Sequence, residues 1–153
     1  MSCPCRRSAG LVLALNKAQE VLLVDRSTRT GLSLPGGSAR AGEAPNEAAA
    51  RCFMMDTGLV IDVWEMLAGD FVYEDTYPEG FNVVFSGGVL TDRQVARIDT
   101  SNPQSRISGH QFVAMAELHL HVAPHPLARI RQAWTALQAG KGLPLLVMGE
   151  PVG

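Results

Sequence analysis

The segment from Gly37 to Leu59 constrains the fold of this chain more than any other part of the sequence. It reads GSARAGEAPNEAAARCFMMDTGL and directly follows the turn Leu34-Pro35-Gly36-Gly37. Pro45 suits the first turn of a helix, and Gly58 suits the residue that ends one. The segment therefore predicts a glycine turn, a polar loop and then one helix from about Pro45 to Thr57.

The same segment resembles the Nudix box, a motif usually written G-x5-E-x7-R-E-U-x-E-E-x-G-U, in which U is a bulky aliphatic residue. Five positions of the motif are in register, namely Gly37, Glu43, Arg51, Gly58 and Leu59. Three glutamate positions of the motif are not glutamate here: they hold Cys52, Met55 and Asp56. The chain is therefore similar to the Nudix hydrolases in its frame and departs from them in its acids.

The rest of the sequence favours an α/β fold. Two apolar runs, Leu11 to Leu15 and Val21 to Val24, predict a hairpin-like pair of buried strands. Further strands are expected at residues 60–67, 71–73, 81–90 and 111–115, with a loop at 100–109. A second amphipathic helix is expected over 126–139, ended by Gly140. This order fits a three-layer α/β/α sandwich on a mixed β-sheet.

The Nudix resemblance implies the same α/β/α sandwich and covers about residues 8–140. We expect a single domain over residues 1–153, because 153 residues suit one domain with a substantial core. The C-terminal tail, residues 141–153, includes an apolar stretch at 143–148. That stretch either adds a short strand or packs against a neighbour.

Composition excludes several classes of partner. The formal net charge of −2 provides no global field that would attract nucleic acid or an anionic membrane. No apolar run approaches the roughly 20 residues that span a bilayer. Three cysteines are an odd number, and Cys3 and Cys5 have no later pair that would complete a zinc site. We therefore expect a cytoplasmic protein without a membrane or nucleic-acid partner.

Hydrolysis of a diphosphate needs divalent ions, and hard ions such as Mg²⁺ need oxygen ligands. The resemblance implies Asp56, Glu43 and Arg51 as catalytic residues, with Asp56 and Glu43 as ligands of Mg²⁺ or Mn²⁺. The sulfur atoms of Cys52 and Met55 are soft donors and poor ligands for these ions. A normal cluster of two or three metal ions is therefore not expected, and the protein holds one ion or none.

Acids outside the motif offer one way to replace the missing glutamates. Glu74 and Asp75, with Glu79 nearby, lie in a loop that relatives often use beside the substrate. The alternative is a solvated acidic turn. If the chain hydrolyses a substrate, Asp56 has to act together with such acids.

Several residues are candidates for binding an anion. Gly36 and Gly37 allow backbone N–H groups to approach phosphate oxygens closely, and Arg51 is a candidate phosphate ligand. The alternative for Arg51 is a structural ion pair with Glu43 that shapes the loop. The arginines beside the turn, Arg26, Arg29 and Arg40, either meet phosphate or are solvated. Arg106, in the loop before the strand at 111–115, would repel a metal ion and attract a phosphate.

Other reactive or aromatic side chains have two interpretations each. Cys52 is a nucleophile or a small packing residue. The three histidines His119, His121 and His125 form a metal site or the polar side of a strand and the start of a helix. An aromatic wall for a base would come from Phe71, Tyr73, Tyr77 or Phe81. Leu32 stands where the family often has a tryptophan, so base stacking is not expected there.

The functional hypothesis is a Nudix-like hydrolase that acts on, or binds, a nucleoside diphosphate linked to another moiety. Its metal-dependent hydrolysis is expected to be weak or altered because two glutamates of the motif are replaced. The alternative is a catalytically silent module of the same fold that binds a nucleotide, a phosphate or a protein. Many relatives dimerise, so the resemblance also implies a homodimer.

Overall fold

The computed structural model describes residues 6–63, 65–73, 79–140, 145–147, 150 and 151. In these residues the elements follow the order β1 (Arg7–Leu15), β2 (Val21–Arg26), β3 (Gly36–Ser38), α1 (Pro45–Thr57), β4 (Met66–Val72), β5 (Gly80–Val89), α2 (Asp92–Ala96), β6 (Ile107–Val113), the 3-10 helix η1 (Met115–Leu120), α3 (Pro124–Ala139), β7 (Leu145–Val147) and β8 (Glu150–Pro151).

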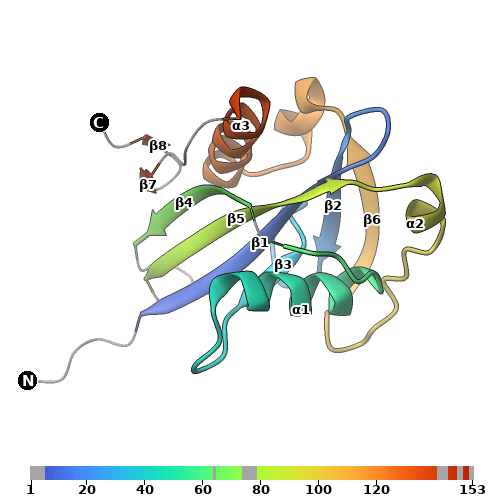
Figure 1. Ribbon diagram of the computed structural model, residues 1–153, viewed down its shortest axis with the longest axis horizontal. Coiled ribbons are helices and arrows are strands. Elements are labelled where there is room, and N and C mark those ends of the chain that lie inside the picture. Colours follow the sequence, from blue (N-terminus) through green and yellow to red (C-terminus); the bar gives the residue numbers. More distant parts are fainter. Residues whose placement is uncertain (1–5, 64, 74–78, 141–144, 148–149, 152–153) are drawn as a thin grey trace, which may run out of the picture.

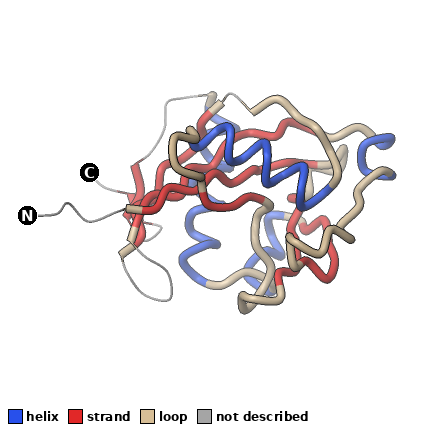
Figure 2. Tube along the Cα trace, turned by 90° about the horizontal axis from the view of Figure 1, so that it is seen from below, coloured by secondary structure: helices blue, strands red, loops and turns tan. Residues whose placement is uncertain are grey.

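Within the described residues, eight strands form one mixed sheet in the order β6-β2-β1-β5-β4-β7-β8, and β3 pairs with β1. The central strand β1 runs antiparallel to β2 and parallel to β5. Helix α1 lies on one face of the sheet and α3 lies on the other (Figures 1 and 2). The prediction of a single-domain α/β/α sandwich on a mixed sheet is therefore confirmed.

The side chains of β1 divide the apolar core into two halves. Leu11, Leu13 and Leu15 belong to the cluster that packs against α3, whereas Val12 and Ala14 belong to the cluster that packs against α1. Successive residues of a strand point to opposite faces of the sheet, so a strand covered on both faces is apolar at every position. This burial on both faces explains the continuous apolar run that marks β1 in the sequence.

Helix α1 begins and ends where the sequence predicts. Pro45 occupies its first turn, and Gly58 ends it with a φ of 75° and donates its N–H to the carbonyl of Met54. The helix lies so close to β1 that a Cβ on Gly10 would stand 2.7 Å from the backbone nitrogen of Ala49. Glycine at this position of β1 therefore sets the distance between the helix and the sheet.

Three sequence predictions are wrong. Most of the strand expected at 60–67 is absent, because β4 begins only at Met66 and Val63 is buried without joining the sheet. Strand β6 begins at Ile107, inside the expected loop at 100–109, because pairing with β2 organises it. His119 lies in the 3-10 helix η1, so the polar strand proposed for His119 and His121 does not form.

Helix α2 was not expected from the sequence. Its first turn is capped by reciprocal hydrogen bonds: the Thr91 hydroxyl accepts from the N–H of Gln94, and the Gln94 side chain accepts from the N–H of Thr91. The spacing of threonine and glutamine matches a capping box and was a usable signal.

The C-terminal tail contributes to the sheet. Strand β7 pairs in parallel with β4, and β8 pairs antiparallel with β7. The described part of the tail therefore adds strands, which is one of the two alternatives left open by the sequence. In the described residues, none of the helices combines the length and apolar character required to cross a membrane.

Candidate functional site

The glycine turn lies directly against the face of α1 that carries the altered motif positions. Strand β3 pairs with β1, with Gly37 opposite Gly10. A Cβ on Gly37 would stand 2.9 Å from the Sγ of Cys52, and Gly36 has a φ of 142°, which L side chains rarely adopt. The two glycines thus allow the turn to approach the helix face that carries Cys52 and Asp56.

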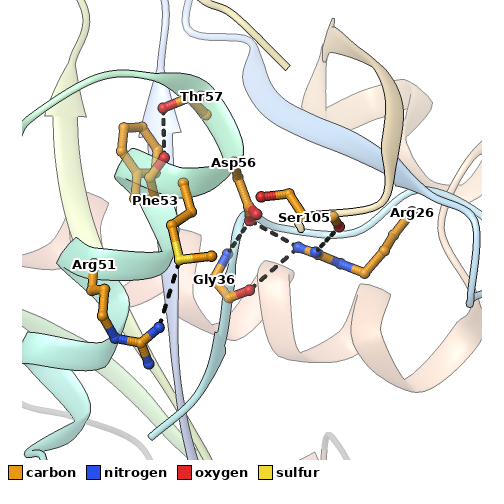
Figure 3. A network of polar contacts seen from close by, with 8 residues as sticks. Arg26, Gly36, Arg51, Phe53, Asp56, Thr57 and Ser105 are labelled. Atoms are coloured by element: carbon orange, nitrogen blue, oxygen red, sulfur yellow. Dashed lines mark hydrogen bonds and ion pairs between the residues drawn. The ribbon is translucent and has the colours of Figure 1, made fainter. Parts of the chain in front are cut away.

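The carboxylate of Asp56 is hydrogen-bonded to other groups of the protein. The Asp56 side chain is 3% exposed, and its Oδ2 atom accepts a hydrogen bond from Nη2 of Arg26 at 2.8 Å. The same oxygen accepts the backbone N–H of Gly36 at 3.0 Å (Figure 3). Asp56, the acid that stands at one of the three altered glutamate positions, is therefore paired with a guanidinium and with the turn.

Arg26 is held by three acceptors. Besides Asp56, its guanidinium donates to the carbonyl of Ser105 at 3.0 Å and to the carbonyl of Gly36 at 3.3 Å (Figure 3). These contacts join β2 to the turn, to the end of α1 and to the segment before β6. The positive charge that faces the Asp56 carboxylate is thus supplied by a side chain fixed in position.

The two sulfur positions do not provide hard ligands. Burial raises the pKa of the Cys52 thiol above its ordinary value, so the thiol is protonated at neutral pH. The Sδ of Met55 accepts a weak hydrogen bond from Nη1 of Arg51 at 3.7 Å. A protonated thiol in this environment is a poor nucleophile, and neither sulfur atom suits Mg²⁺ or Mn²⁺.

The motif resemblance implies a divalent ion such as Mg²⁺ or Mn²⁺, and the donors at the described motif positions do not fit such an ion. Two of the three motif positions carry sulfur, and the carboxylate of Asp56 already binds Arg26. In the described part of the chain, no group of three or more His, Cys, Asp or Glu side chains is placed to hold a metal ion.

Glu43 and Arg51 form a two-pronged ion pair that shapes the loop before α1. Arg51 donates from Nε to Oε2 of Glu43 and from Nη2 to Oε1, both at 2.8 Å. It also donates to the carbonyl of Ser38 at 3.2 Å. Hydrogen bonds from Arg51 and from the backbone of Arg40 lower the pKa of Glu43 to about 2. This geometry corresponds to the structural ion pair that the sequence left as one alternative.

A pocket of about 210 Å³ opens beside the glycine turn, on the side of the sheet that faces α3. Among the described residues that line it are four arginines and no acidic side chain; the arginines are Arg7, Arg26, Arg29 and Arg129. Gly36, Gly37, Ser33 and Asn82 also line it. The Nη1 atom of Arg7 donates to Oδ1 of Asn82 at 3.0 Å.

Arg129 enters this pocket from α3 and is bound to β4. Its Nε atom lies 2.6 Å from Oδ2 of Asp70, and both side chains are almost fully buried. Burial lowers the pKa of Arg129, while Asp70 opposes this shift. The neighbouring carboxylate therefore keeps a buried guanidinium charged beside the pocket.

The structure brings together some of the residues proposed from sequence. Gly36, Gly37, Arg26 and Arg29 meet at the pocket, whereas Arg40, Arg51 and Arg106 are not among its lining residues. Sequence reasoning missed Arg7, Arg129 and Asn82. A signal for Arg129 existed, because it is a charged residue on the apolar stripe of a helix, between Leu127 and Ile130.

Other candidates lie elsewhere or outside the described residues. Glu74, Asp75 and Tyr77 are outside the described residues, as are Cys3 and Cys5. Glu79 is described, and its carboxylate pairs with Arg6 at 2.9 Å. In the described part of the chain, no three or more His, Cys, Asp or Glu side chains, His119, His121 and His125 among them, are grouped to hold a metal ion.

The aromatic cluster does not line the pocket. The ring of Phe71 packs against those of Tyr73 and Phe81, with centroids 5.2 Å apart in both pairs. Phe81 precedes Asn82 in β5, and neighbouring residues of a strand point to opposite faces. Because Asn82 faces the pocket, the aromatic cluster lies on the other face of the sheet.

A glycine turn and a helix lie against a mixed sheet, beside an arginine-lined pocket, in an α/β/α sandwich. Comparison with protein-family models identifies the family to which the chain belongs. The NUDIX domain model matches residues 4–137, so the chain belongs to the Nudix family. The comparison with curated proteins found no match.

Solved structures share the fold at low sequence identity. The MutT protein from Methanosarcina mazei Go1 is 21% identical, with a TM-score of 0.71 over 92% of this chain and 100% of that one. A UDP-X diphosphatase is 18% identical, with a TM-score of 0.73 over 95% of this chain and 69% of that one. An ADP-ribose pyrophosphatase from Streptococcus suis 89-1591 is 12% identical, with a TM-score of 0.62 over 94% and 99%. At these identities the likeness establishes the fold alone.

Proposed function

We propose that this chain binds a nucleoside diphosphate linked to another moiety and hydrolyses it slowly or not at all. The observation that carries the proposal is the state of Asp56. Its carboxylate accepts hydrogen bonds from Arg26 and from the N–H of Gly36, while the other two glutamate positions hold Cys52 and Met55. Without free carboxylates on this helix face, divalent ions have no hard ligands to activate water.

The ligand class is supported by the family and by two structural neighbours. The names of those neighbours, a UDP-X diphosphatase and an ADP-ribose pyrophosphatase, describe nucleoside diphosphates joined to a further group. The basic pocket beside Gly36 and Gly37 suits the anionic part of such a compound. We assign phosphate binding to the turn and the pocket, and loop shaping to Arg51 with Glu43.

The alternative is hydrolysis with one Mg²⁺ or Mn²⁺ ion held by Asp56 and Glu43, assisted by Glu74 or Asp75. It requires Asp56 to exchange Arg26 for a metal ion and Glu43 to release Arg51. Both exchanges break ion pairs with contacts of 2.8 Å. The proposal of binding without efficient turnover requires neither exchange.

A thermal-shift screen combined with an assay of cleavage tests the proposal. The purified chain is incubated with ADP-ribose, UDP-glucose and related compounds, with and without Mg²⁺ or Mn²⁺. A ligand at 100 times its Kd stabilises the native state by about 2.7 kcal/mol. In a domain of this size that corresponds to a rise in Tm of very roughly 5 to 10 °C.

A Tm increase without measurable cleavage supports the proposal. Turnover at the ordinary enzymatic rate of about 1 s⁻¹ or more would establish the hydrolase alternative instead. In that case Asp56→Asn should abolish the turnover. If no compound in the panel raises the Tm, the result contradicts the proposal and favours an interaction domain without a nucleotide ligand.

Two further features are proposed from sequence alone. The odd number of cysteines favours a reducing compartment, so we propose a cytoplasmic location. We also propose a homodimer, on the basis of the family resemblance. Sedimentation velocity of the purified chain tests the dimer directly, and a mass of one chain at micromolar concentration would exclude it.

A further inference from the structure

We propose that two copies of this chain associate through the open side of strands β4 and β5. The inference rests on the homodimer proposed above, and it adds where the interface of that dimer lies. We call this surface the β4–β5 face. Its described residues are Met66, Gly69, Phe71, Tyr73, Phe81 and Val83.

The register of the two strands places most of these residues on one side of the sheet. In the antiparallel pair, Gly69 is opposite Val83 and Phe71 is opposite Phe81. Residues that oppose each other directly lie on the same face. The ring of Phe71 also packs against the ring of Tyr73. Because Val83 packs against the core cluster beneath α1, the face lies on the α1 side of the sheet.

Helix α1 does not extend over this face. It packs mainly against β1 and β3, and β4 lies beyond β5 from them (Figure 1). A Cβ on Gly69 would meet no described atom within 4 Å. The opposite side of β4 is covered by α3. Among the described residues, β4 is therefore covered on one side and open on the other.

The area of the face matches the need of a stable dimer. Met66 is 49% exposed, Tyr73 57% and Phe81 39%. With roughly 200 Å² of accessible surface for a large side chain, these three expose roughly 300 Å². A standard interface buries about 800 Å² on each partner, of which roughly 450 Å² is apolar. The face therefore supplies most of that apolar area, and Phe71 and Val83, which are partly exposed, add to it.

The character of the face favours a second copy of the chain over a charged partner. None of its six described residues is charged, and Asp70, the acid of β4, is buried against Arg129 of α3. A formal net charge of −2 causes little repulsion between two copies. An apolar face without charges therefore matches an equally apolar surface, and the face itself is one.

The shape of the face also suits a two-fold dimer. Such a dimer buries the same patch on both copies, so the patch has to be complementary to itself. The absence of a side chain at Gly69 leaves a hollow, and the exposed rings of Tyr73 and Phe81 project beside it. Across a two-fold axis, a ring of each copy fills the hollow of the other.

Sedimentation velocity over a series of concentrations, from micromolar to submillimolar, tests the inference with two variants of the face. Gly69→Arg fills the hollow with a charged side chain, and the open space there lets the single chain accommodate it. Phe81→Glu removes a projecting ring. Thermal melts show whether each variant is folded, and Gly69→Arg carries the test if Phe81→Glu is not.

Each variant has a matched control elsewhere on the surface. Gly109→Arg places the same side chain in β6, where a Cβ likewise meets no atom within 4 Å. Leu120→Glu makes a similar change at an apolar side chain of η1 that is 69% exposed. Neither control alters the β4–β5 face.

We expect the unaltered chain and both controls to dimerise. Loss of an aromatic residue at the centre of an interface weakens association roughly thirtyfold or more, so the face variants should be monomers at concentrations where the controls are dimers. Face variants that dimerise like their controls would overturn the inference. Controls that lose the dimer to the same extent as the face variants would overturn it as well.

These outcomes separate the inference from the proposals on which it rests. If the unaltered chain dimerises and the face variants do too, the homodimer stands and the assignment of its interface is wrong. If the unaltered chain is a monomer throughout the series, both are wrong. Ligand binding is tested independently, because the arginine-lined pocket lies on the α3 side of the sheet. A rise in Tm with ADP-ribose should therefore be the same in the face variants and in the controls.

Discussion

The Oδ2 atom of Asp56 lies 2.8 Å from Nη2 of Arg26, and this ion pair joins the last turn of α1 to the end of β2. The Asp56 side chain is 3% exposed and that of Arg26 is 17% exposed. The same carboxylate oxygen also accepts the N–H of Gly36. One atom thus holds the helix, the second strand and the glycine turn together.

Removal of one partner of this pair should destabilise the fold. Asp56→Ala leaves the guanidinium of Arg26 partly buried without its counter-charge, which costs about 3 to 5 kcal/mol in buried pairs. We expect the lower end of that range because Arg26 retains some exposure. Urea unfolding measures the loss. The control Asp62→Ala alters an exposed acid and should change the free energy of unfolding by about 0.5 kcal/mol or less.

The ion pair between Asp70 and Arg129 should show how burial determines the value of a charge contact. Its side chains are 0% and 6% exposed, so Asp70→Ala should cost about 3 to 5 kcal/mol. Lys17 and Asp92 are 2.8 Å apart but are 67% and 79% exposed, so Asp92→Ala should cost about 1 kcal/mol or less. Chemical denaturation of both variants tests the contrast, and equal losses would contradict it.

Glu43 should make the stability of the chain depend on pH in the acid range. Hydrogen bonds from Arg51 and from the backbone of Arg40 lower its pKa from the ordinary 4.5 to about 2 in the folded state. A carboxyl group with a lowered folded pKa contributes stability that is complete above pH 4.5 and is lost as the pH falls towards 2. Unfolding midpoints measured between these pH values should fall less steeply for Glu43→Gln than for the unaltered chain.

Glu65→Gln is the control for this experiment, because Glu65 is exposed and its pH dependence should match the unaltered chain. An NMR titration of the Glu43 carboxyl group gives the same answer independently. A titration midpoint near 4.5 would mean that the pair with Arg51 is not formed in solution.

Gly10→Ala should displace α1 from the sheet. The added Cβ would stand 2.7 Å from the backbone nitrogen of Ala49 and 2.8 Å from its Cβ. Such overpacking typically costs about 1 to 3 kcal/mol or more. Gly69→Ala is the matched control in β4, because a Cβ there meets no atom within 4 Å. Thermal unfolding should show a lower Tm for the first variant and an unchanged or slightly higher Tm for the second.

Restoring the motif acids should create a metal site only when Arg26 is also changed. In Cys52→Glu with Met55→Glu, the third carboxylate remains paired with Arg26. Adding Arg26→Gln releases Asp56, so the triple variant should bind Mn²⁺ detectably while the unaltered chain does not. Calorimetric titration with MnCl₂ measures this difference. Strong Mn²⁺ binding by the double variant alone would show that the Arg26 pair is easily displaced.

Local signals predicted part of the fold well. Pro45 and Gly58 define the ends of α1, and Gly140 defines the end of α3, because the preferences of proline and glycine at helix ends act through the backbone nearby. The apolar residues of the segment 60–67 favour a strand, but Val60 is exposed and Val63 is buried outside the sheet, and β4 begins only at Met66. Strand pairing depends on distant partners, which local composition does not specify.

In the candidate site, too, the local features follow from the sequence, whereas the contacts between distant residues do not. The sequence by itself determined that two of the three motif glutamates are replaced by Cys52 and Met55, and that a glycine turn precedes the helix. Only the tertiary structure decided that the remaining Asp56 is paired with Arg26, thirty positions earlier, and that Arg7 and Arg129 meet at one pocket. These side chains converge because the mixed sheet places β1, β2 and α3 beside the turn. No periodicity or propensity within a segment encodes which distant charges become neighbours.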